Sequence, residues 1–516
     1  MKKIIPFLLM FGVLVCRAQT AQLNNVLSVK LEKLGPIYQN KQVKGYFMFY
    51  QYDKIDRNTN DYLLKILDEN LQPVGEQHIT GGKQMIVEDA AFDNNHIIVK
   101  LVDPAEYLVK YIMYDENAKE IEKKDLVMDK KDFKVYMEIS RMGIMGQNTV
   151  SAIEDVGFVS VSAQRFDKSG YSIEFLGREN GKKKYWKYES PEEGMHQFAG
   201  YLAGNKDQVF SLVLKRKNNM TGVIEVFFQA HSTQTGKRLF EVPLRSDGTV
   251  LWPTNAFSDG GNILLTGAVF EDDDKLLKAK SQGLGLVVYS PAGKELKKKT
   301  ITWEEAGDKV KADGEVKRPT SIYFHDVVKM PTGNFMFVGE SYRRSANAGG
   351  IAMNALNIAG GGSPTAFSNT KVMIDDMVML EISPQMALKE VHLYKKATNN
   401  AGLGYTDYAS LALLGNIAKA TGAFDYLDTQ TDPENPNRFS INYIDYDKLD
   451  EEKGGKTTYY GTIIYNNGKF SVDKIPLKST RSGIRRVYPA KPGFAMMLNY
   501  NKKAKSIDLE LIKVRN

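Results

Sequence analysis

Hydrophobic and β-branched residues recur along the chain in short runs, and a polar turn separates the members of each pair. The clearest example is GLVVYSPAGKELKKKTITW at 285–303, where one run reaches Tyr289, a turn covers Ser290 to Gly293, and a second run ends at Trp303. Two runs joined by such a turn predict a β-hairpin. Helical periodicity is nearly absent, so the pattern predicts an all-β protein.

The same hairpin pattern recurs at six other places. These lie at 62–79, 107–128, 172–188, 224–244, 377–394 and 459–477. Most are preceded by a further short strand that a Gly- or Asn-rich turn introduces, as in FDNNHIIVKLVD from residue 92. Each repeat therefore contains about four strands, and such a unit buries its faces only against neighbouring copies. This organisation is that of a β-propeller blade.

The number of repeats indicates the size of the ring. Seven repeats are complete, and a partial eighth begins near residue 482, with strands at 493–500 and 506–514. Its missing outer strand is expected from residues 23–31, because pairing of the N- and C-terminal strands would close the ring. We therefore predict one β-propeller domain over residues 23–516 with eight blades. A seven-bladed ring stays open as the alternative, because the repeat spacing is irregular.

The N-terminus has the layout of a secretory signal peptide. Lys2 and Lys3 precede an apolar run at 4–15, and Ala18 follows as a small residue suited to cleavage. We therefore expect a signal peptide at 1–18 and an exported chain. The apolar run is shorter than the roughly 20 residues of a membrane helix, so no transmembrane segment is expected.

The only cysteine of the chain is Cys16, inside the expected signal peptide. A disulfide framework is therefore excluded for the mature chain, whose stability must come from a packed core. Val15 is not the small residue that precedes a lipidated cysteine in a bacterial lipoprotein, so no lipid anchor is expected.

The charge of the mature chain is close to balanced. Loss of residues 1–18 lowers the formal charge from +7 to +4, because Lys2, Lys3 and Arg17 are removed. The lysine runs at 182–184 and 297–299 follow hairpin turns, where charged edges block edge-to-edge pairing. No concentrated basic face is evident, so nucleic acid is not an expected partner.

Two insertions interrupt the repeats. They cover 343–371, rich in Gly, Ala and Asn, and 399–432. Long loops in compact domains are either functional or disordered, and these contain too many apolar residues for disorder. We expect both insertions to pack on one face of the ring, with a short helix at 408–421.

The insertions also contain the expected ligand-binding residues. Aromatic rings on a loop face offer a large contact area at low entropic cost, which suits glycan or peptide binding. The alternative is that these rings hold the loops against the ring of blades. The expected ligand-binding residues are Tyr342, Arg343, Arg344, Tyr405, Tyr408, Phe424 and Tyr426.

The candidates for catalysis are few. His325 and Asp326 lie in YFHDVVKMPTG, which is expected to be the innermost strand of the sixth repeat, beside the central channel. Asp375 is a third candidate, and the alternative for the His-Asp pair is a role in fixing a turn. The chain has no GxSxG elbow and its mature part has no thiol, which disfavours the familiar nucleophilic hydrolases.

Metal and cofactor sites have no support in the sequence. The six histidines are scattered without ligand spacing, and the acidic pair Asp375 and Asp376 lacks the alternating pattern of a calcium loop. We therefore expect neither a metal ion nor a cofactor.

The expected signal peptide, the cysteine-free mature chain and the hairpin turns NNGK, PAGK and DENA lead to a family resemblance. The chain resembles functionally uncharacterised, exported β-propeller-like proteins of Gram-negative bacteria. The resemblance implies a propeller fold and a place in the cell envelope, in the periplasm or on the outer surface. It carries no catalytic residues with it.

The leading hypothesis is a non-catalytic binding or scaffolding propeller that recognises an envelope protein, a peptide or a glycan on the face with the insertions. The alternative is a glycan-active enzyme at the central channel that uses His325, Asp326 and Asp375. A third reading is a cell-surface stress or adhesion factor without a small ligand. The oligomeric state stays open.

Overall fold

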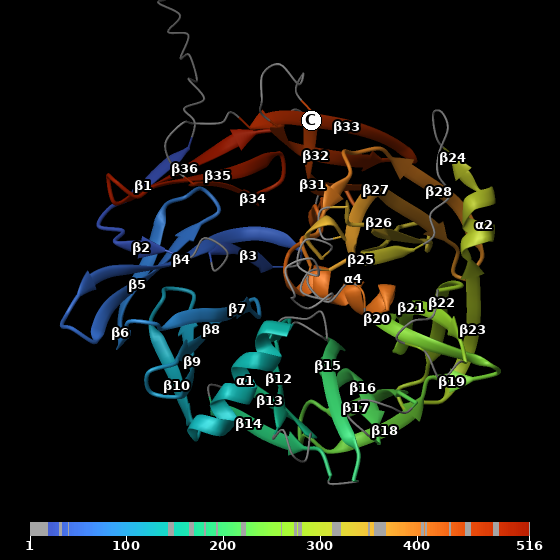
Figure 1. Ribbon diagram of the computed structural model, residues 1–516, viewed down its shortest axis with the longest axis horizontal. Helices are drawn as coiled ribbons and strands as arrows, with labels where there is room; N and C mark the ends of the chain where they lie inside the picture. The colour runs from blue at the N-terminus through green and yellow to red at the C-terminus, as the bar shows by residue number, and fades with distance from the viewer. Residues whose placement is uncertain are drawn as a thin grey trace, which may run out of the picture.

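The described residues form eight sheets arranged as blades around a ring, and the four main strands of each blade pair antiparallel (Figure 1). The computed structural model describes residues 19–29, 34–39, 41–142, 149–164, 170–179, 182–191, 194–217, 223–259, 261–272, 276, 281–311, 321–348, 351–354, 368–403, 407, 410–432, 435–448, 456–477 and 484–514. The all-β propeller is confirmed, and eight blades rather than seven make up the ring.

Each blade is a meander of four strands, numbered from the axis outward. Blade 1 consists of β3 (Gly35–Gln39), β4 (Gln42–Lys54), β5 (Thr59–Asp68) and β6 (Pro73–Gly82), and blade 2 of β7 (Ile86–Phe92), β8 (His96–Asp103), β9 (Leu108–Asp115) and β10 (Glu120–Val127). Blade 3 consists of β11 (Ser151–Ile153), β12 (Gly157–Gln164), β13 (Gly170–Glu179) and β14 (Lys182–Glu189), and blade 4 of β15 (His196–Gly204), β16 (Gln208–Arg216), β17 (Glu225–Ser232) and β18 (Arg238–Pro243).

The second half of the ring follows the same plan. Blade 5 consists of β20 (Thr249–Asp259), β21 (Asn262–Glu271), β22 (Gly283–Tyr289) and β23 (Glu295–Thr302), and blade 6 of β25 (Ile322–Lys329), β26 (Phe335–Ala346), β27 (Thr370–Ile382) and β28 (Leu388–Tyr394). Blade 7 consists of β30 (Tyr426–Thr431), β31 (Arg438–Lys448), β32 (Lys456–Asn466) and β33 (Lys469–Leu477), and blade 8 of β34 (Ile484–Pro489), β35 (Phe494–Asn501), β36 (Ser506–Lys513) and β1 (Thr20–Leu23). Short strands β2 (Ser28–Val29), β19 (Arg245–Ser246), β24 (Val310–Lys311) and β29 (Asn399–Asn400) extend blades 1, 5, 6 and 6.

The ring closes by pairing of the two ends of the chain, as predicted, but with different residues. The closing strand is β1, whose residues Thr20–Leu23 pair with β36, rather than 23–31. Asn25 adopts φ 59°, a left-handed conformation that turns the chain away from blade 8. Ser28–Val29 then pair with β4 of blade 1, so the predicted closing segment is divided between two blades.

The hairpin turns between the third and fourth strands have a common physical basis. In the turn after β9, the Asp115 carboxylate accepts hydrogen bonds from the backbone N–H groups of Asn117 and Lys119, at 3.0 and 2.9 Å. Ala118 in the same turn adopts φ 61°. Short polar side chains that bind nearby backbone in this way favour tight turns, which explains the repeated Asp, Asn and Ser signals in the sequence.

The two faces of the ring differ in their connections. In a four-stranded meander, the links from strand 2 to 3 and from strand 4 to the next blade leave from the same face. This insertion face carries the connection at 347–369 and the helices α1 (Lys130–Met142), α2 (Trp303–Asp308) and α4 (Leu411–Ala420). The opposite turn face carries short links such as 69–72 and 467–468.

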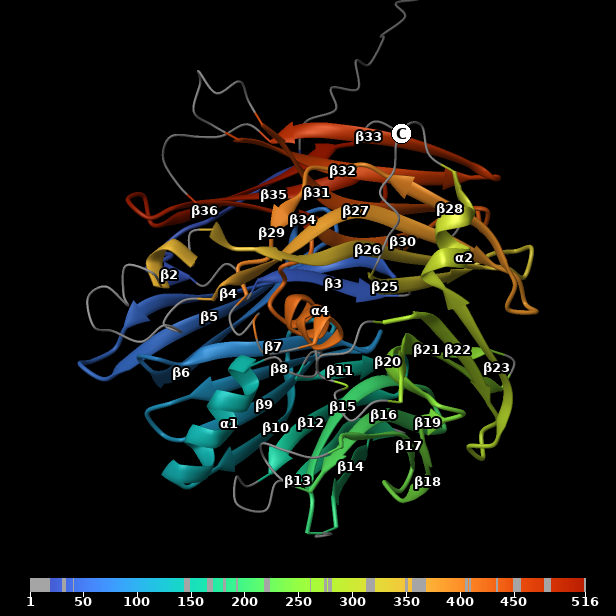
Figure 2. The same ribbon diagram turned by 45° about the vertical axis from the view of Figure 1, so that its right-hand side comes forward.

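The helices include one predicted and two unpredicted elements. α4 confirms the helix expected at 408–421, and both views place it in the middle of the ring (Figure 1, Figure 2). Its N-terminal cap is Ser410, whose side chain accepts a hydrogen bond from the Leu413 N–H. No helix within the described ranges is both long and apolar enough to cross a membrane.

The core consists of apolar layers between neighbouring blades. One layer joins blades 8, 1 and 2 and contains buried residues such as Leu509, Tyr46 and Val99. Separate layers lie between the later blades, for example around Phe228 and Trp252 between blades 4 and 5. Stability is therefore distributed around the ring, as expected for a repeat architecture.

Candidate functional site

Blade 6 and the start of blade 7 contain every candidate residue that the structure describes. His325 and Asp326 lie on β25, the innermost strand of blade 6, as expected. The residues on the longer strands of this blade are Tyr342, Arg343 and Arg344 on β26 and Asp375 on β27. Phe424 and Tyr426 lie at the start of blade 7. Tyr405 and Tyr408 lie outside the described residues, as do residues 1–18 of the expected signal peptide.

The His325 ring is enclosed by aromatic side chains. It stacks on Tyr426 with ring centroids 4.4 Å apart and an interplanar angle of 2°, and its edge meets Phe424 at 4.7 Å. The side chain is 0% exposed. Burial, together with the Lys419 ammonium, lowers the pKa of His325 to about 4, so the ring is neutral at pH 7.

Polar groups meet both nitrogens of the buried imidazole. His325 Nε2 lies 3.2 Å from Glu340 Oε2, and Nδ1 lies 3.4 Å from the Lys419 ammonium of α4. The Tyr426 backbone N–H donates a hydrogen bond of 2.9 Å to the same Glu340 oxygen. The imidazole thus joins blade 6, α4 and blade 7, which is a structural arrangement rather than one that exposes a base to a substrate.

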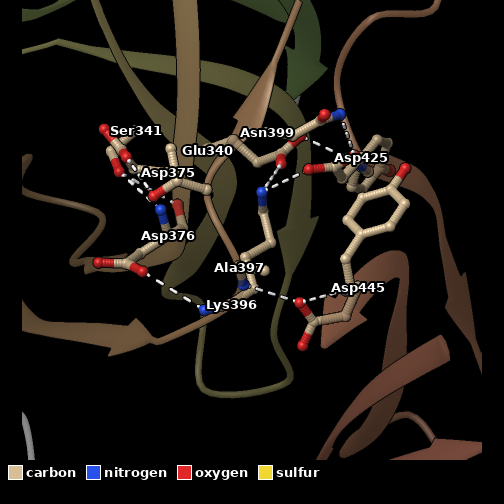
Figure 3. A network of polar contacts seen from close by, with 12 residues as sticks. Glu340, Ser341, Asp375, Asp376, Lys396, Ala397, Asn399, Asp425 and Asp445 are labelled. Carbon is tan, nitrogen blue, oxygen red and sulfur yellow. Dashed lines mark hydrogen bonds and ion pairs between the residues drawn. The ribbon is translucent and has the colours of Figure 1, made fainter. Parts of the chain in front are cut away.

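A buried ion-pair network surrounds Lys396, which follows β28. Its ammonium lies 2.6 Å from Asp425 Oδ2 and 3.3 Å from Glu340 Oε1, and Figure 3 shows it between the two carboxylates. The Asn399 amide donates to the other Asp425 oxygen at 3.0 Å. All three charged side chains are at most 3% exposed. The network therefore fastens the second insertion to blades 6 and 7.

The pKa shifts of this network follow from burial and charge. Burial opposes the charged form of Lys396, but Glu340 and Asp425 outweigh it and raise the pKa of the ammonium. Burial likewise opposes ionisation of Glu340, yet His325 and Lys396 lower the pKa of this carboxyl group. Burial raises the pKa of Asp425 to about 6. Lys396, Glu340 and Asp425 are therefore all mainly charged at neutral pH.

A second, more exposed set of contacts holds Asp375. The Arg343 guanidinium donates from Nε to Asp375 Oδ2 at 2.8 Å, and the Thr398 hydroxyl donates to Oδ1 at 2.9 Å. Both carboxylate oxygens are therefore engaged. The Arg343 side chain is 40% exposed, so it reaches the surface of the insertion face while it pairs.

Asp326 is paired across the ring. Lys41, in the turn between β3 and β4 of blade 1, contacts Asp326 Oδ1 at 2.7 Å and donates to the Val327 carbonyl at 3.1 Å. Blades 1 and 6 are not neighbours in the chain order of the ring, so this contact crosses its middle. The carboxylate therefore contributes to holding the centre of the propeller together.

The two insertions are joined to each other. Asp407 of the second insertion accepts hydrogen bonds from the backbone N–H groups of Asn369 and Thr370, at 2.8 and 2.9 Å, and from the Thr370 hydroxyl at 2.7 Å. Asn354 donates to the Asn369 amide oxygen at 2.9 Å. Both insertions thus meet at the start of β27, on the insertion face.

The predicted aromatic residues pack inward. Tyr342 is 5% and Phe424 7% exposed, and both contact Leu414 and Ala418 of α4 in one apolar cluster. These two rings hold the second insertion against blade 6. This is the alternative role given above, in place of an exposed surface on which a ligand could stack. Two of the expected ligand-binding residues reach the surface: Arg344 is exposed, and the Arg343 side chain is 40% exposed while it pairs with Asp375.

The sequence pattern did not single out two exposed residues of the first insertion. Ile351 is 48% and Met353 46% exposed, although the next residue, Asn354, is buried. Ile351 belongs to a helical turn, since its N–H donates to the Asn347 carbonyl at 2.9 Å.

The three candidates for catalysis, His325, Asp326 and Asp375, are each buried or paired. Within the described ranges, no three metal-ligating side chains come together. The accessible groups here include the side chains of Arg343 and Arg344 and the apolar side chains of Ile351 and Met353.

Several solved structures have a similar chain course at low sequence identity. The WD40 domain of SCAP from fission yeast is 7% identical, with 96% of this chain and 98% of that chain covered and a TM-score of 0.36. Quinohemoprotein alcohol dehydrogenase from Comamonas testosteroni is 9% identical, with coverages of 96% and 76% and a TM-score of 0.37. One of two prolyl endopeptidases is 8% identical, with coverages of 93% and 55% and a TM-score of 0.38.

At these scores the likenesses carry no argument about activity. None of the curated proteins is detectably similar to the sequence. A family model does match, and it extends over residues 1–515. The chain therefore belongs to DUF6770, a family of unknown function.

Proposed function

We propose that this chain is an exported, non-catalytic binding or scaffolding propeller that recognises a protein partner of the cell envelope through its insertion face. The observation that carries the proposal is the exposure of Ile351 and Met353, at 48% and 46%, on a segment that hydrogen bonds hold to blade 6. Protein interfaces are enriched in Met and Arg side chains, which fits Met353 and the partly exposed Arg343 on the same face of the ring. A protein or peptide is therefore favoured over a glycan.

The alternative of a glycan-active enzyme has less support. Its candidate residues were His325, Asp326 and Asp375. The first has a fully buried side chain, and the other two are held in ion pairs with Lys41 and Arg343. A general acid or base must come within hydrogen-bond reach of the substrate, and these contacts occupy the groups that would do so.

Export is supported by the position of the closing strand. The Gln19 carbonyl accepts a hydrogen bond of 2.9 Å from the Leu511 N–H. β1 begins at Thr20. Cleavage after Ala18 would leave every strand of blade 8 intact, as a signal peptide requires. We place the mature chain in the periplasm or on the outer surface.

Affinity capture with matched variants tests the binding face. The mature chain is immobilised and exposed to envelope extract, and its partner yield is compared with that of a double variant, Ile351→Asp with Met353→Asp. We expect at least a tenfold loss, because charges at the centre of an apolar contact cost more than about 1.4 kcal/mol. Both residues are exposed, so the melting temperature should stay unchanged.

The control variant is Val472→Asp. Val472 is 44% exposed on β33, the outer strand of blade 7, away from the insertions. It should retain full capture. Equal partner yields from the wild type and the double variant would contradict the proposed binding face.

A further inference from the structure

A second candidate site lies on the turn face, between blades 7 and 8. It is a cavity of about 90 Å³. One water needs about 10–15 Å³, so the cavity can hold several waters or one edge of a small molecule. Its walls come from the ends of β30, β31, β32 and β36 and from the turn at 492–494.

Gln430 presents an unpartnered oxygen at this cavity. The residue is 3% exposed, and its Nε2 donates to Asp428 Oδ2 at 2.8 Å and to the Ala490 carbonyl at 2.9 Å. Both partners are acceptors, so the amide cannot be flipped, and its orientation is fixed. Oε1 has no hydrogen-bond partner among the described residues. A buried carbonyl without a partner costs about 1–3 kcal/mol, which a donor from a ligand would relieve.

The neighbouring polar wall is also fixed. The Thr462 hydroxyl donates to Asn442 Oδ1 at 3.0 Å, and the Asn442 amide donates to Asp428 Oδ1 at 2.8 Å. The hydroxyl proton of Thr462 is therefore used, and its oxygen remains an acceptor. Ser440 adds a second hydroxyl to the lining. The cavity thus offers several acceptors and a hydroxyl that can donate or accept.

The charged side chains around the cavity already have hydrogen-bond or ion-pair partners. Asp428 receives hydrogen bonds on both oxygens from Gln430 and Asn442. At the mouth, the Arg438 guanidinium lies 3.7 Å from the Asp432 carboxylate. Both Asp428 oxygens and the Arg438 guanidinium are therefore already engaged, and neither an ammonium group nor an anion would find a charged partner without such contacts. A neutral ligand with hydroxyl groups fits this lining best.

We propose that this cavity binds one hydroxyl-bearing edge of a neutral sugar or polyol. Gln430 Oε1 and the Thr462 hydroxyl oxygen accept from ligand hydroxyls, and the Ser440 hydroxyl exchanges a hydrogen bond with them. The apolar side chains of Ile464 and Phe494 line the same space and contact the carbon atoms of the ligand. The site is independent of the proposed protein-binding face, because it opens on the opposite side of the ring.

Calorimetric titration of the mature chain tests this site. The probes are glycerol, D-glucose and N-acetyl-D-glucosamine, with methylammonium chloride and sodium acetate as charged comparisons. We expect saturable binding of at least one neutral probe and none of the charged ones. Saturation by a charged probe alone, or by no probe, would overturn the proposal.

Two variants locate the binding. Ser440→Leu fills the cavity from a half-buried position, and Thr462→Val removes a hydroxyl at nearly constant volume. Each variant should weaken the affinity for the neutral probe at least tenfold. The matched control is Ser162→Leu, a half-buried position on β12, the second strand of blade 3, which should leave affinity unchanged. Unaltered affinity in both cavity variants, with unchanged melting temperatures, would also refute the site.

Discussion

Replacing Lys396 by alanine is expected to lower the free energy of unfolding by about 3–5 kcal/mol, because it leaves buried carboxylates without their counter-charge. Glu340 and Asp425 lie 3.3 and 2.6 Å from the ammonium, and both are buried. Water cannot reach them to replace the lost interaction. Denaturant unfolding at pH 7, monitored by tryptophan fluorescence and circular dichroism, measures the change.

The matched control is Lys389→Ala. Lys389 is an exposed lysine on β28 of the same blade, so its loss should change the free energy of unfolding by less than about 0.5 kcal/mol. A loss below about 1 kcal/mol for Lys396→Ala would show that the network does not hold the second insertion to the ring.

Acidification is expected to destabilise the wild type through His231, and the substitution His231→Phe should remove this effect. His231 on β17 is 0% exposed, and neither ring nitrogen has a hydrogen-bond partner among the described residues. Its ring contacts Tyr188 with centroids 4.3 Å apart, a contact that phenylalanine can keep. Burial, assisted by the nearby Arg238 charge, lowers the pKa of His231 to about 3.

The direction of the effect follows from proton binding. An unfolded histidine has a pKa near 6.5, so between pH 6.5 and 3 the unfolded chain binds more protons at this position than the folded chain. Stability from His231 is complete above pH 6.5 and is lost as the pH falls toward 3. At about 1.4 kcal/mol per pKa unit, the loss reaches the order of 4 kcal/mol by pH 3.

Unfolding free energies of the wild type and His231→Phe at pH 7, 6, 5 and 4 measure this dependence. Taking the difference between the proteins cancels other groups, such as Asp425, whose pKa is raised to about 6 and whose contribution has the opposite sign. Below pH 6.5, the free energy of unfolding of His231→Phe should rise progressively relative to that of the wild type. A pH-independent difference for His231→Phe would contradict the account.

Local patterns predicted the blades because each hairpin and its turn lie close together in sequence. The helix α1 was missed because its apolar face is short: Phe133 and Tyr136 are its buried residues in the cluster beside blade 2. Its start is nevertheless marked by Asp129, which accepts hydrogen bonds from the N–H groups of Lys131 and Asp132. The strand that closes the ring was displaced because nothing local distinguishes pairing with blade 8 from pairing with blade 1.

The candidate site was predicted only in part. The position of His325 on an innermost strand follows from counting strands, and the structure agrees. Its partner Glu340 belongs to a network with Lys396 and Asp425, whose three members come from separate segments that only the packing of blades 6 and 7 brings together. A possible signal was Glu340 within the apolar run MFVGESY, since a charge in a buried strand requires a partner.

The most direct test of the central claim is site-specific photo-crosslinking in the cells that make the protein. A photoreactive amino acid is placed at Ile351 or Met353, which the account assigns to the interface, or at Val472, which is similarly exposed on β33. The account predicts the same protein adduct from positions 351 and 353 and none from 472. An adduct from 472 alone, or no adduct from 351 and 353, would contradict the assignment of the insertion face as the binding surface.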